Sequence, residues 1–147
     1  YPKGNQISEL DNGDFVPGKA SVIKEGTDGT IVAEGQWVGN ALEATALLLE
    51  KGINSEIIDI RTIKPLDYDT IFKSANKTSK LFVLEENLIR GGIGEMISTE
   101  AKLRNLGFAI QLKAIDDKFV THGSIDEISR YYGFTPNQIA NDIERML

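Results

Sequence analysis

Short apolar runs alternate with longer amphipathic stretches along most of the chain. The apolar runs are rich in β-branched and aromatic residues and predict strands at residues 20–24, 30–33, 57–60, 81–84 and 108–115. The stretches between them carry apolar residues at helical spacing and predict helices at about residues 38–51, 68–76 and 93–103, with two short helices after residue 123. This alternation predicts an α/β fold with right-handed crossovers and a mostly parallel sheet that is covered on both faces.

Polar residues and glycines mark the ends of the predicted helices. Asp67 is placed to cap the helix that follows it, and Pro65 prevents a simple continuation of the preceding strand. Gly52 and Gly107 are each expected to end a helix. Two capping boxes predict the starts of the last two helices, Ser124 with Glu127 and Thr135 with Gln138. The inward face predicted for helix 38–51 comprises Val38, Ala41, Leu42, Thr45, Leu48 and Leu49.

Length and local composition indicate one domain with an arm. The chain has 147 residues, enough to bury a substantial core. Residues 1–18 are polar, contain Pro2 and Pro17 and show no sustained period, so we expect an N-terminal arm or linker before a domain at residues 19–147. The sequence opens without an initiator methionine, and we expect it to be a piece of a larger protein.

Charge and composition exclude several classes of function. The net charge is −6 and the basic residues are scattered, which argues against nucleic-acid binding. No apolar run approaches the length of a membrane span, and no signal peptide is evident. Because the chain has no cysteine, it has no disulfide, thiolate metal ligand or cysteine nucleophile. We therefore expect a cytoplasmic protein that acts on neither nucleic acid nor membrane.

Arg61 is the first candidate for a binding residue. It follows the apolar run that ends at Ile60, and open α/β sheets bind their ligands beyond the carboxyl ends of their strands. A guanidinium at this place suits a phosphate or a carboxylate, because its planar fork donates two parallel hydrogen bonds. Pairing of Arg61 with an acid of this acidic domain is the alternative, and local sequence leaves both open.

The other candidates give weaker signals. Residues 91–94 form a glycine-rich loop at a helix start, which could hold an anion but more often serves a tight turn and close packing. Glu85 and Glu86 are adjacent and should point to opposite faces, so they form no catalytic pair, and their role is undetermined. His122 lacks partners at metal-ligand spacing, and Trp37 suggests packing. The residues supply no complete catalytic apparatus and no metal site.

Five stretches of the chain form a recognisable set: Tyr1-Pro2-Lys3-Gly4, Gly35-Gln36-Trp37-Val38 before Ala41-Leu42-Glu43-Ala44, Asp59 to Asp67, Val83 to Gly94, and Asp117 to Gly123. In this order and spacing they resemble the C-terminal domain of thiamine-diphosphate-dependent transketolase-like enzymes. The Arg-x-x-Lys-Pro-Leu-Asp pattern is typical of the superfamily. The first and last stretches favour its 1-deoxy-D-xylulose-5-phosphate synthase branch.

The resemblance implies a three-layer α/β/α fold whose five-stranded sheet has an antiparallel first strand. It implies that Arg61 contacts the phosphate of glyceraldehyde 3-phosphate. The family's second phosphate-binding arginine would precede Tyr1. Lys3 stands where many members carry arginine, and it keeps the charge but loses the fork. Lys3 and His122 are further candidates for the edge of the site.

The resemblance also implies an activity and partners. The intact enzymes join pyruvate and glyceraldehyde 3-phosphate with loss of carbon dioxide, a step of isoprenoid biosynthesis. Their first two domains bind thiamine diphosphate and magnesium, so this piece is expected to be inactive alone and to bind no cofactor. Its expected partners are the N-terminal and middle domains and, in a homodimer, a second subunit. The alternatives are the C-terminal part of a sugar transketolase and a non-catalytic interaction domain of the same fold.

Overall fold

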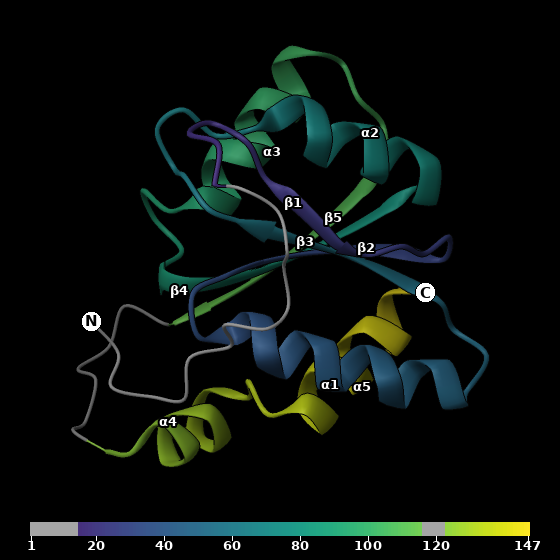
Figure 1. The fold of residues 1–147 in the computed structure, drawn as a ribbon, viewed down its shortest axis with the longest axis vertical. Helices are drawn as coiled ribbons and strands as arrows, with labels where there is room; N and C mark the ends of the chain where they lie inside the picture. The colour runs from purple at the N-terminus through teal and green to yellow at the C-terminus, as the bar shows by residue number, and fades with distance from the viewer. Residues whose placement is uncertain (1–14, 116–122) are drawn as a thin grey trace.

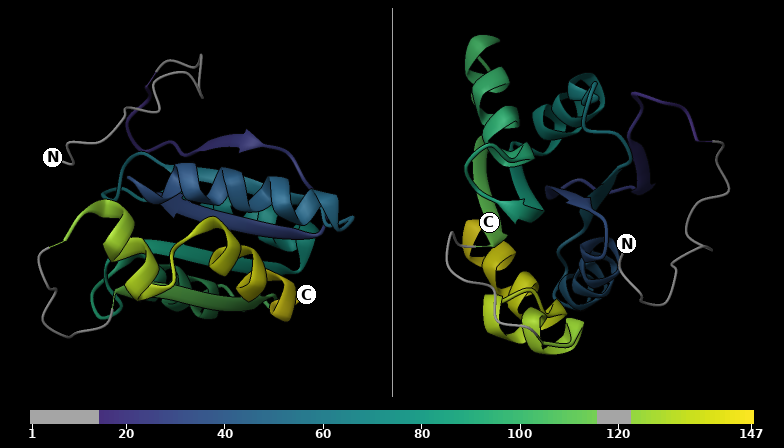
Figure 2. Two further views of the ribbon diagram at one scale, coloured as in Figure 1. Left: turned by 90° about the horizontal axis from the view of Figure 1, so that it is seen from below. Right: turned by 90° about the vertical axis from the view of Figure 1, so that its left-hand side faces the viewer.

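The computed structural model describes residues 15–115 and 123–147 and shows a five-stranded sheet between two layers of helices (Figure 1, Figure 2). The strands are β1 (Ser21–Lys24), β2 (Gly29–Glu34), β3 (Ser55–Ile60), β4 (Lys80–Leu88) and β5 (Ala109–Ile115). The helices are α1 (Trp37–Glu50), α2 (Tyr68–Thr78), α3 (Ile93–Leu103), α4 (Ile125–Tyr132) and α5 (Pro136–Met146). The predicted α/β class is confirmed.

The sheet has the strand order β1-β3-β2-β4-β5. Strand β1 pairs with β3 in the antiparallel sense, whereas β2 is parallel to β3 and to β4, and β4 is parallel to β5. The mixed sheet with an antiparallel first strand, which the resemblance implied, is therefore confirmed. Parallel neighbours bring the carboxyl ends of β2, β3 and β4 to one edge, called here the carboxyl edge, and their amino ends to the opposite amino edge.

Each face of the sheet builds its own core. Helices α1, α4 and α5 lie on one face, and α2 and α3 lie on the other (Figure 1). The interior strand β4 contributes Phe82 and Leu84 to the α1/α5 side, and Leu81 and Val83 to the α2/α3 side. All four are at most 2% exposed. The continuous apolar run that predicted this strand follows from burial on both faces.

Most predicted helix ends are confirmed. The Asp67 carboxylate accepts a hydrogen bond from the backbone N–H of Thr70, and both capping boxes form. Two details were wrong. Helix α3 ends at Leu103 as predicted, but Asn105, rather than the expected Gly107, adopts a positive φ of 54° after it. Leu49 is 54% exposed, because the buried face of α1 does not extend to it and is formed by Trp37, Val38, Ala41, Ala44, Thr45 and Leu48.

The amino edge is densely hydrogen-bonded. Thr30 Oγ1 at the start of β2 lies 2.6 Å from Ser74 Oγ and 2.8 Å from Thr78 Oγ1, both on α2. Glu56 at the start of β3 is 3% exposed, and it accepts hydrogen bonds from Lys77 Nζ and from the N–H of Gly26. These hydrogen bonds lower the pKa of Glu56 although burial by itself would raise it.

None of the helices within residues 15–115 and 123–147 is long and apolar enough to cross a membrane. The division into an arm at residues 1–18 and a domain at residues 19–147 stays a prediction, because residues 1–14 lie outside the described part of the chain.

Candidate functional site

The carboxyl edge gathers polar residues at the ends of three strands. Glu34 ends β2, Arg61 follows β3, and Glu85 lies near the end of β4. The register pairs Glu34 with Ile60 and Ala33 with Leu84, so the three side chains leave the sheet at similar heights. This edge is where an α/β sheet of this kind binds its ligands.

Arg61 lies at this edge, as predicted, with its side chain 17% exposed. Its Nε is 3.7 Å from the Oδ2 of Asp59, an acid near the end of β3. Burial raises the pKa of Asp59. At this distance the contact between Arg61 and Asp59 is a loose ion pair and not a bidentate one.

The loop that carries Arg61 is fixed at several points. Thr62 Oγ1 accepts a hydrogen bond from the N–H of Gly18 at 2.9 Å and donates one to the carbonyl of Pro65 at 3.2 Å. The Asp67 carboxylate accepts from the N–H of Ala20 and from the hydroxyl of Thr70. Burial opposes ionisation of Asp67, but its hydrogen bonds outweigh burial and lower its pKa. Arg61 is therefore presented from a well-supported loop.

The glycine-rich loop before α3 is filled by the protein's own carboxylate. Glu85 is 1% exposed, and it accepts hydrogen bonds from the N–H groups of Ile93 at 2.6 Å and Gly94 at 3.2 Å. A Cβ at Gly92 would overlap the Glu85 carboxylate, and one at Gly94 would crowd Leu112. The interpretation of this loop as a tight turn with close packing is supported, and the helix N-terminus already holds an anion.

Glu34 is a second buried carboxylate at the same edge. It is 7% exposed, and its Oε1 accepts hydrogen bonds from the N–H of Glu86 at 3.0 Å and from Asn87 Nδ2 at 3.2 Å. Burial raises the pKa of Glu34, and the nearby Glu85 and Glu86 raise it further. Burial likewise raises the pKa of Glu85. As predicted, Glu85 and Glu86 differ in environment, since Glu85 is buried and Glu86 is half-buried.

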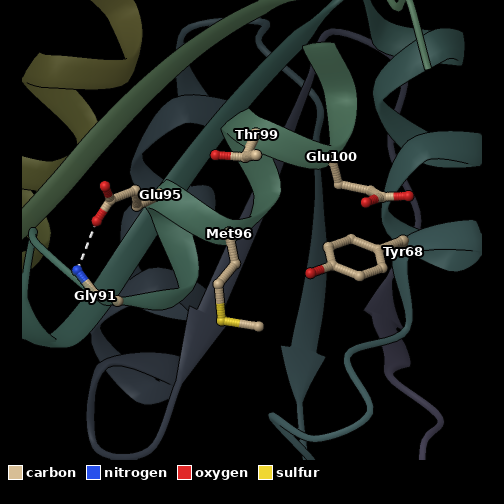
Figure 3. Close-up of a pocket in the computed structure, with 7 residues that line it drawn as sticks. Tyr68, Gly91, Glu95, Met96, Thr99 and Glu100 are labelled. Carbon is tan, nitrogen blue, oxygen red and sulfur yellow. Dashed lines mark hydrogen bonds between the residues drawn. The ribbon is translucent and has the colours of Figure 1, made fainter. Parts of the chain in front are cut away.

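Two adjoining pockets open beside the start of α3. The larger has a volume of about 430 Å³ and lies between Tyr68 of α2 and Glu95, Met96 and Thr99 of α3 (Figure 3). Its floor includes Gly91, whose N–H donates to Glu95 at 2.6 Å. The smaller pocket, of about 120 Å³, shares Gly91, Gly92 and Met96 with the larger and is also lined by Ile63 after β3, by Asn87 and Leu88 at the end of β4, and by Arg90. Arg61 lines neither pocket.

The remaining candidates from the sequence are Trp37, Lys3 and His122. Trp37 is a core residue, 1% exposed and stacked on Phe134 at 4.4 Å between ring centroids. Lys3 and His122 lie outside the described residues, so their roles stay predictions. Sequence reasoning missed Arg90 and the structural use of Glu34. A signal for Glu34 existed, because a glutamate directly following an apolar strand repeats the pattern at Glu85.

The described residues contain no group of three or more His, Cys, Asp or Glu side chains arranged to hold a metal ion. The carboxylates of Glu34 and Glu85 are engaged by backbone and amide N–H groups. The described residues of this edge are therefore a poor fit to a magnesium diphosphate, because the buried carboxylates are committed to the protein's own N–H groups and only the second oxygen of Glu34 is left without a hydrogen bond.

Comparison with known proteins gives consistent matches. The family described as "Transketolase, C-terminal domain" matches residues 18–139. The 1-deoxy-D-xylulose-5-phosphate synthase of Heliobacterium modesticaldum is 34% identical over 95% of this chain, and that of Clostridium acetobutylicum is 37% identical over 90%. A subunit of the apulose-4-phosphate transketolase of Phocaeicola vulgatus is 37% identical over 86% of the chain.

A solved structure has the same fold. The chain described as "Split gene transketolase, inactive beta4 tetramer" has a TM-score of 0.82 and 28% identity over 89% of this chain. This chain spans 22% of the length of both synthases, 40% of the transketolase subunit and 43% of the solved chain.

Proposed function

Because the chain belongs to the transketolase C-terminal domain family, we propose that it forms the C-terminal domain of a 1-deoxy-D-xylulose-5-phosphate synthase. The observation that carries this proposal is the match to several such synthases at 33–37% identity over nearly the whole chain. The intact enzyme would join pyruvate to glyceraldehyde 3-phosphate and release carbon dioxide. Thiamine diphosphate would supply the carbanion chemistry, held by the other domains as the resemblance implies.

Within that enzyme, Arg61 contributes to binding of the acceptor phosphate. It lies at the carboxyl edge, and its loop is held by Thr62 and Asp67. A single charge-assisted contact contributes about 1.5–3 kcal/mol, so Arg61 acts together with groups outside the described residues. The remaining surface contacts the other domains and a second subunit, because this fold makes up only part of each relative described above.

The test uses the intact protein with pyruvate and glyceraldehyde 3-phosphate. Arg61→Ala is expected to raise the KM for the aldehyde phosphate about tenfold or more, with little change in the dependence on pyruvate. Arg145→Ala is the matched control, because Arg145 lies on α5 with its side chain 78% exposed. An unchanged KM in Arg61→Ala would reduce Arg61 to a structural residue and leave the synthase assignment standing.

One subunit of a split transketolase is the second candidate function. The similarity to the transketolase subunit from Phocaeicola vulgatus and to the solved split-gene transketolase favours it. The donor substrate distinguishes the two. Turnover with pyruvate supports the synthase, whereas no turnover with pyruvate and clear turnover with a ketose phosphate would move the assignment to a transketolase.

A further inference from the structure

The segment at residues 86–92, which comprises the last residues of β4 and the turn before α3, exposes apolar side chains at the carboxyl edge. Leu88 is 40% exposed and Ile89 is 41% exposed. Ile63, on the loop after β3, is 39% exposed and lines the same small pocket as Leu88 and Arg90. These four residues, Ile63, Leu88, Ile89 and Arg90, are called the edge patch. Two of the aliphatic side chains, Ile63 and Leu88, line one pocket, and Ile89 directly follows Leu88 in the chain. Exposed aliphatic groups gathered in this way are typical of a contact surface.

Arg90 gives the edge patch its charge. It is exposed, and no acid among the described residues forms an ion pair with it. The nearby acids are engaged elsewhere: Glu85 by Ile93 and Gly94, and Glu95 by Gly91. A guanidinium set among aliphatic side chains is suited to a carboxylate that is itself surrounded by apolar groups.

Buried carboxylates hold the segment at residues 86–92 in one shape. Glu34 fixes its first residues through the N–H of Glu86 and the side chain of Asn87. Glu85 fixes the residues beyond this segment through two N–H groups of α3. Between them, the N–H of Gly92 donates to the carbonyl of Ile89 at 3.3 Å. A segment ordered before binding loses little conformational entropy on contact, so even a small patch can contribute to affinity.

From these observations we infer that the edge patch is a preformed docking surface for another domain of the same enzyme. Its partner surface presents a carboxylate to Arg90 and aliphatic side chains to Leu88 and Ile89. This inference rests on the proposed function, which makes the chain one part of a longer enzyme. It specifies the surface by which this domain contacts the rest of that enzyme. The choice of a partner domain follows from the share of the relatives' length that lies outside this fold and from the exposed guanidinium of Arg90.

The burial of Glu34 and Glu85 is consistent with this role. Two carboxylates without a cation beside them in the described residues are costly to bury, and their hydrogen bonds all go to the segment at residues 86–94. Their effect is to set the position of the edge patch. If the positions of Glu34 and Glu85 served only to complete the core, apolar side chains would fill them equally well.

Hydrogen–deuterium exchange of the intact protein tests the inference. Arg90→Glu is expected to raise exchange at least about tenfold in residues 86–92 and also in one segment outside residues 1–147. Arg90→Lys should restore most of the protection. Lys102→Glu, a charge reversal on an exposed residue of the last turn of α3, is the control and should leave both segments unchanged. Leu88→Ser, with Leu103→Ser as its control, repeats the test for the apolar contact.

Three results would overturn the inference. An increase in exchange that is confined to residues 86–92 would show that this segment contacts no other domain. A second affected segment inside residues 1–147 would indicate a second copy of this domain. A raised KM for the aldehyde phosphate with unchanged exchange would make Arg90 an anion-binding residue. Absence of synthase turnover in the wild-type protein would sink the proposed function instead, and the exchange result would still be readable.

Discussion

The buried glutamates at the two edges of the sheet have pKa values that are shifted in opposite directions. At the amino edge, Glu56 has a lysine and several hydrogen-bond donors, and its pKa is lowered. At the carboxyl edge, burial raises the pKa of Glu34 and Glu85, and each accepts hydrogen bonds from neutral N–H groups. The charge of Glu56 therefore stabilises the fold at the amino edge. At the carboxyl edge the burial of Glu34 and Glu85 costs free energy, and their hydrogen bonds fix loops at the candidate site.

Glycine substitutions should give the largest difference between the two edges. A Cβ at Gly26, on the amino side, would overlap the backbone of Ser55 and Glu56, so Gly26→Ala is expected to cost about 3 kcal/mol or more. At Gly92 the added Cβ would meet the Glu85 side chain, which can rotate away, so Gly92→Ala should cost less, about 1–3 kcal/mol. Urea denaturation measures both.

Gly107→Ala is the control for these substitutions, because no heavy atom lies within 4 Å of an added Cβ there and its φ is not positive. It should change the free energy of unfolding by less than about 1 kcal/mol. Equal costs at Gly26 and Gly92 would contradict the view that the carboxyl-edge loop is held by a movable side chain.

Removal of the charge of Glu56 should have an intermediate effect. Glu56→Gln weakens the contacts with Lys77 and Gly26, at a cost of about 1–3 kcal/mol near pH 7, toward the lower end because Lys77 is 44% exposed. Since the folded-state pKa of Glu56 is lowered, its contribution is fully present above the ordinary pKa of glutamate and is lost as the pH falls through the lowered value. The gap between variant and wild type should therefore narrow on acidification. A difference in the free energy of unfolding between variant and wild type that stayed constant from pH 7 to pH 3 would contradict a lowered pKa for Glu56.

Glu34→Gln should have the smallest effect, and one of opposite sign. Both hydrogen bonds go to one oxygen of Glu34, which the glutamine carbonyl can replace. The pKa of Glu34 is raised, so the native state binds more protons than the unfolded state, and stability falls as the pH rises above the ordinary glutamate value. The variant should be more stable than wild type by up to about 1 kcal/mol near pH 8, and the gain should vanish near pH 4. A loss of stability near pH 8 would show that the ionised form is favoured.

Local pattern predicted the fold well because each element carried its own signal. The apolar run at residues 81–84 and the capping residue Asp67 are confirmed, since burial on two faces and an N-cap both act over a few residues. The end of α3 at Leu103 is confirmed, but the left-handed residue after it was predicted wrongly, because Asn105 also tolerates this conformation and lies nearer to the last helical turn than Gly107.

The candidate site could be predicted only in part. The position of Arg61 at a strand end follows from the sequence, but its loose pairing with Asp59 depends on side-chain geometry. The contacts of Glu34 with residues 86 and 87 join segments about fifty positions apart, and no local pattern reveals them. Arg90 gave no signal, since its importance lies in the lack of an acid beside it in the described part of the chain.

The position of Glu85 also bears on how other anions would compete at the start of α3. A carboxylate tethered a few residues from the N–H groups it binds has an effective concentration in the millimolar range or above. A free phosphate would have to displace it and leave its charge buried. Removal of this tether, for example in Glu85→Ser, would convert a closed turn into a vacant anion receptor. A glycine-rich turn of this kind can therefore be interpreted as a phosphate site only where no carboxylate at the end of the preceding strand binds its N–H groups.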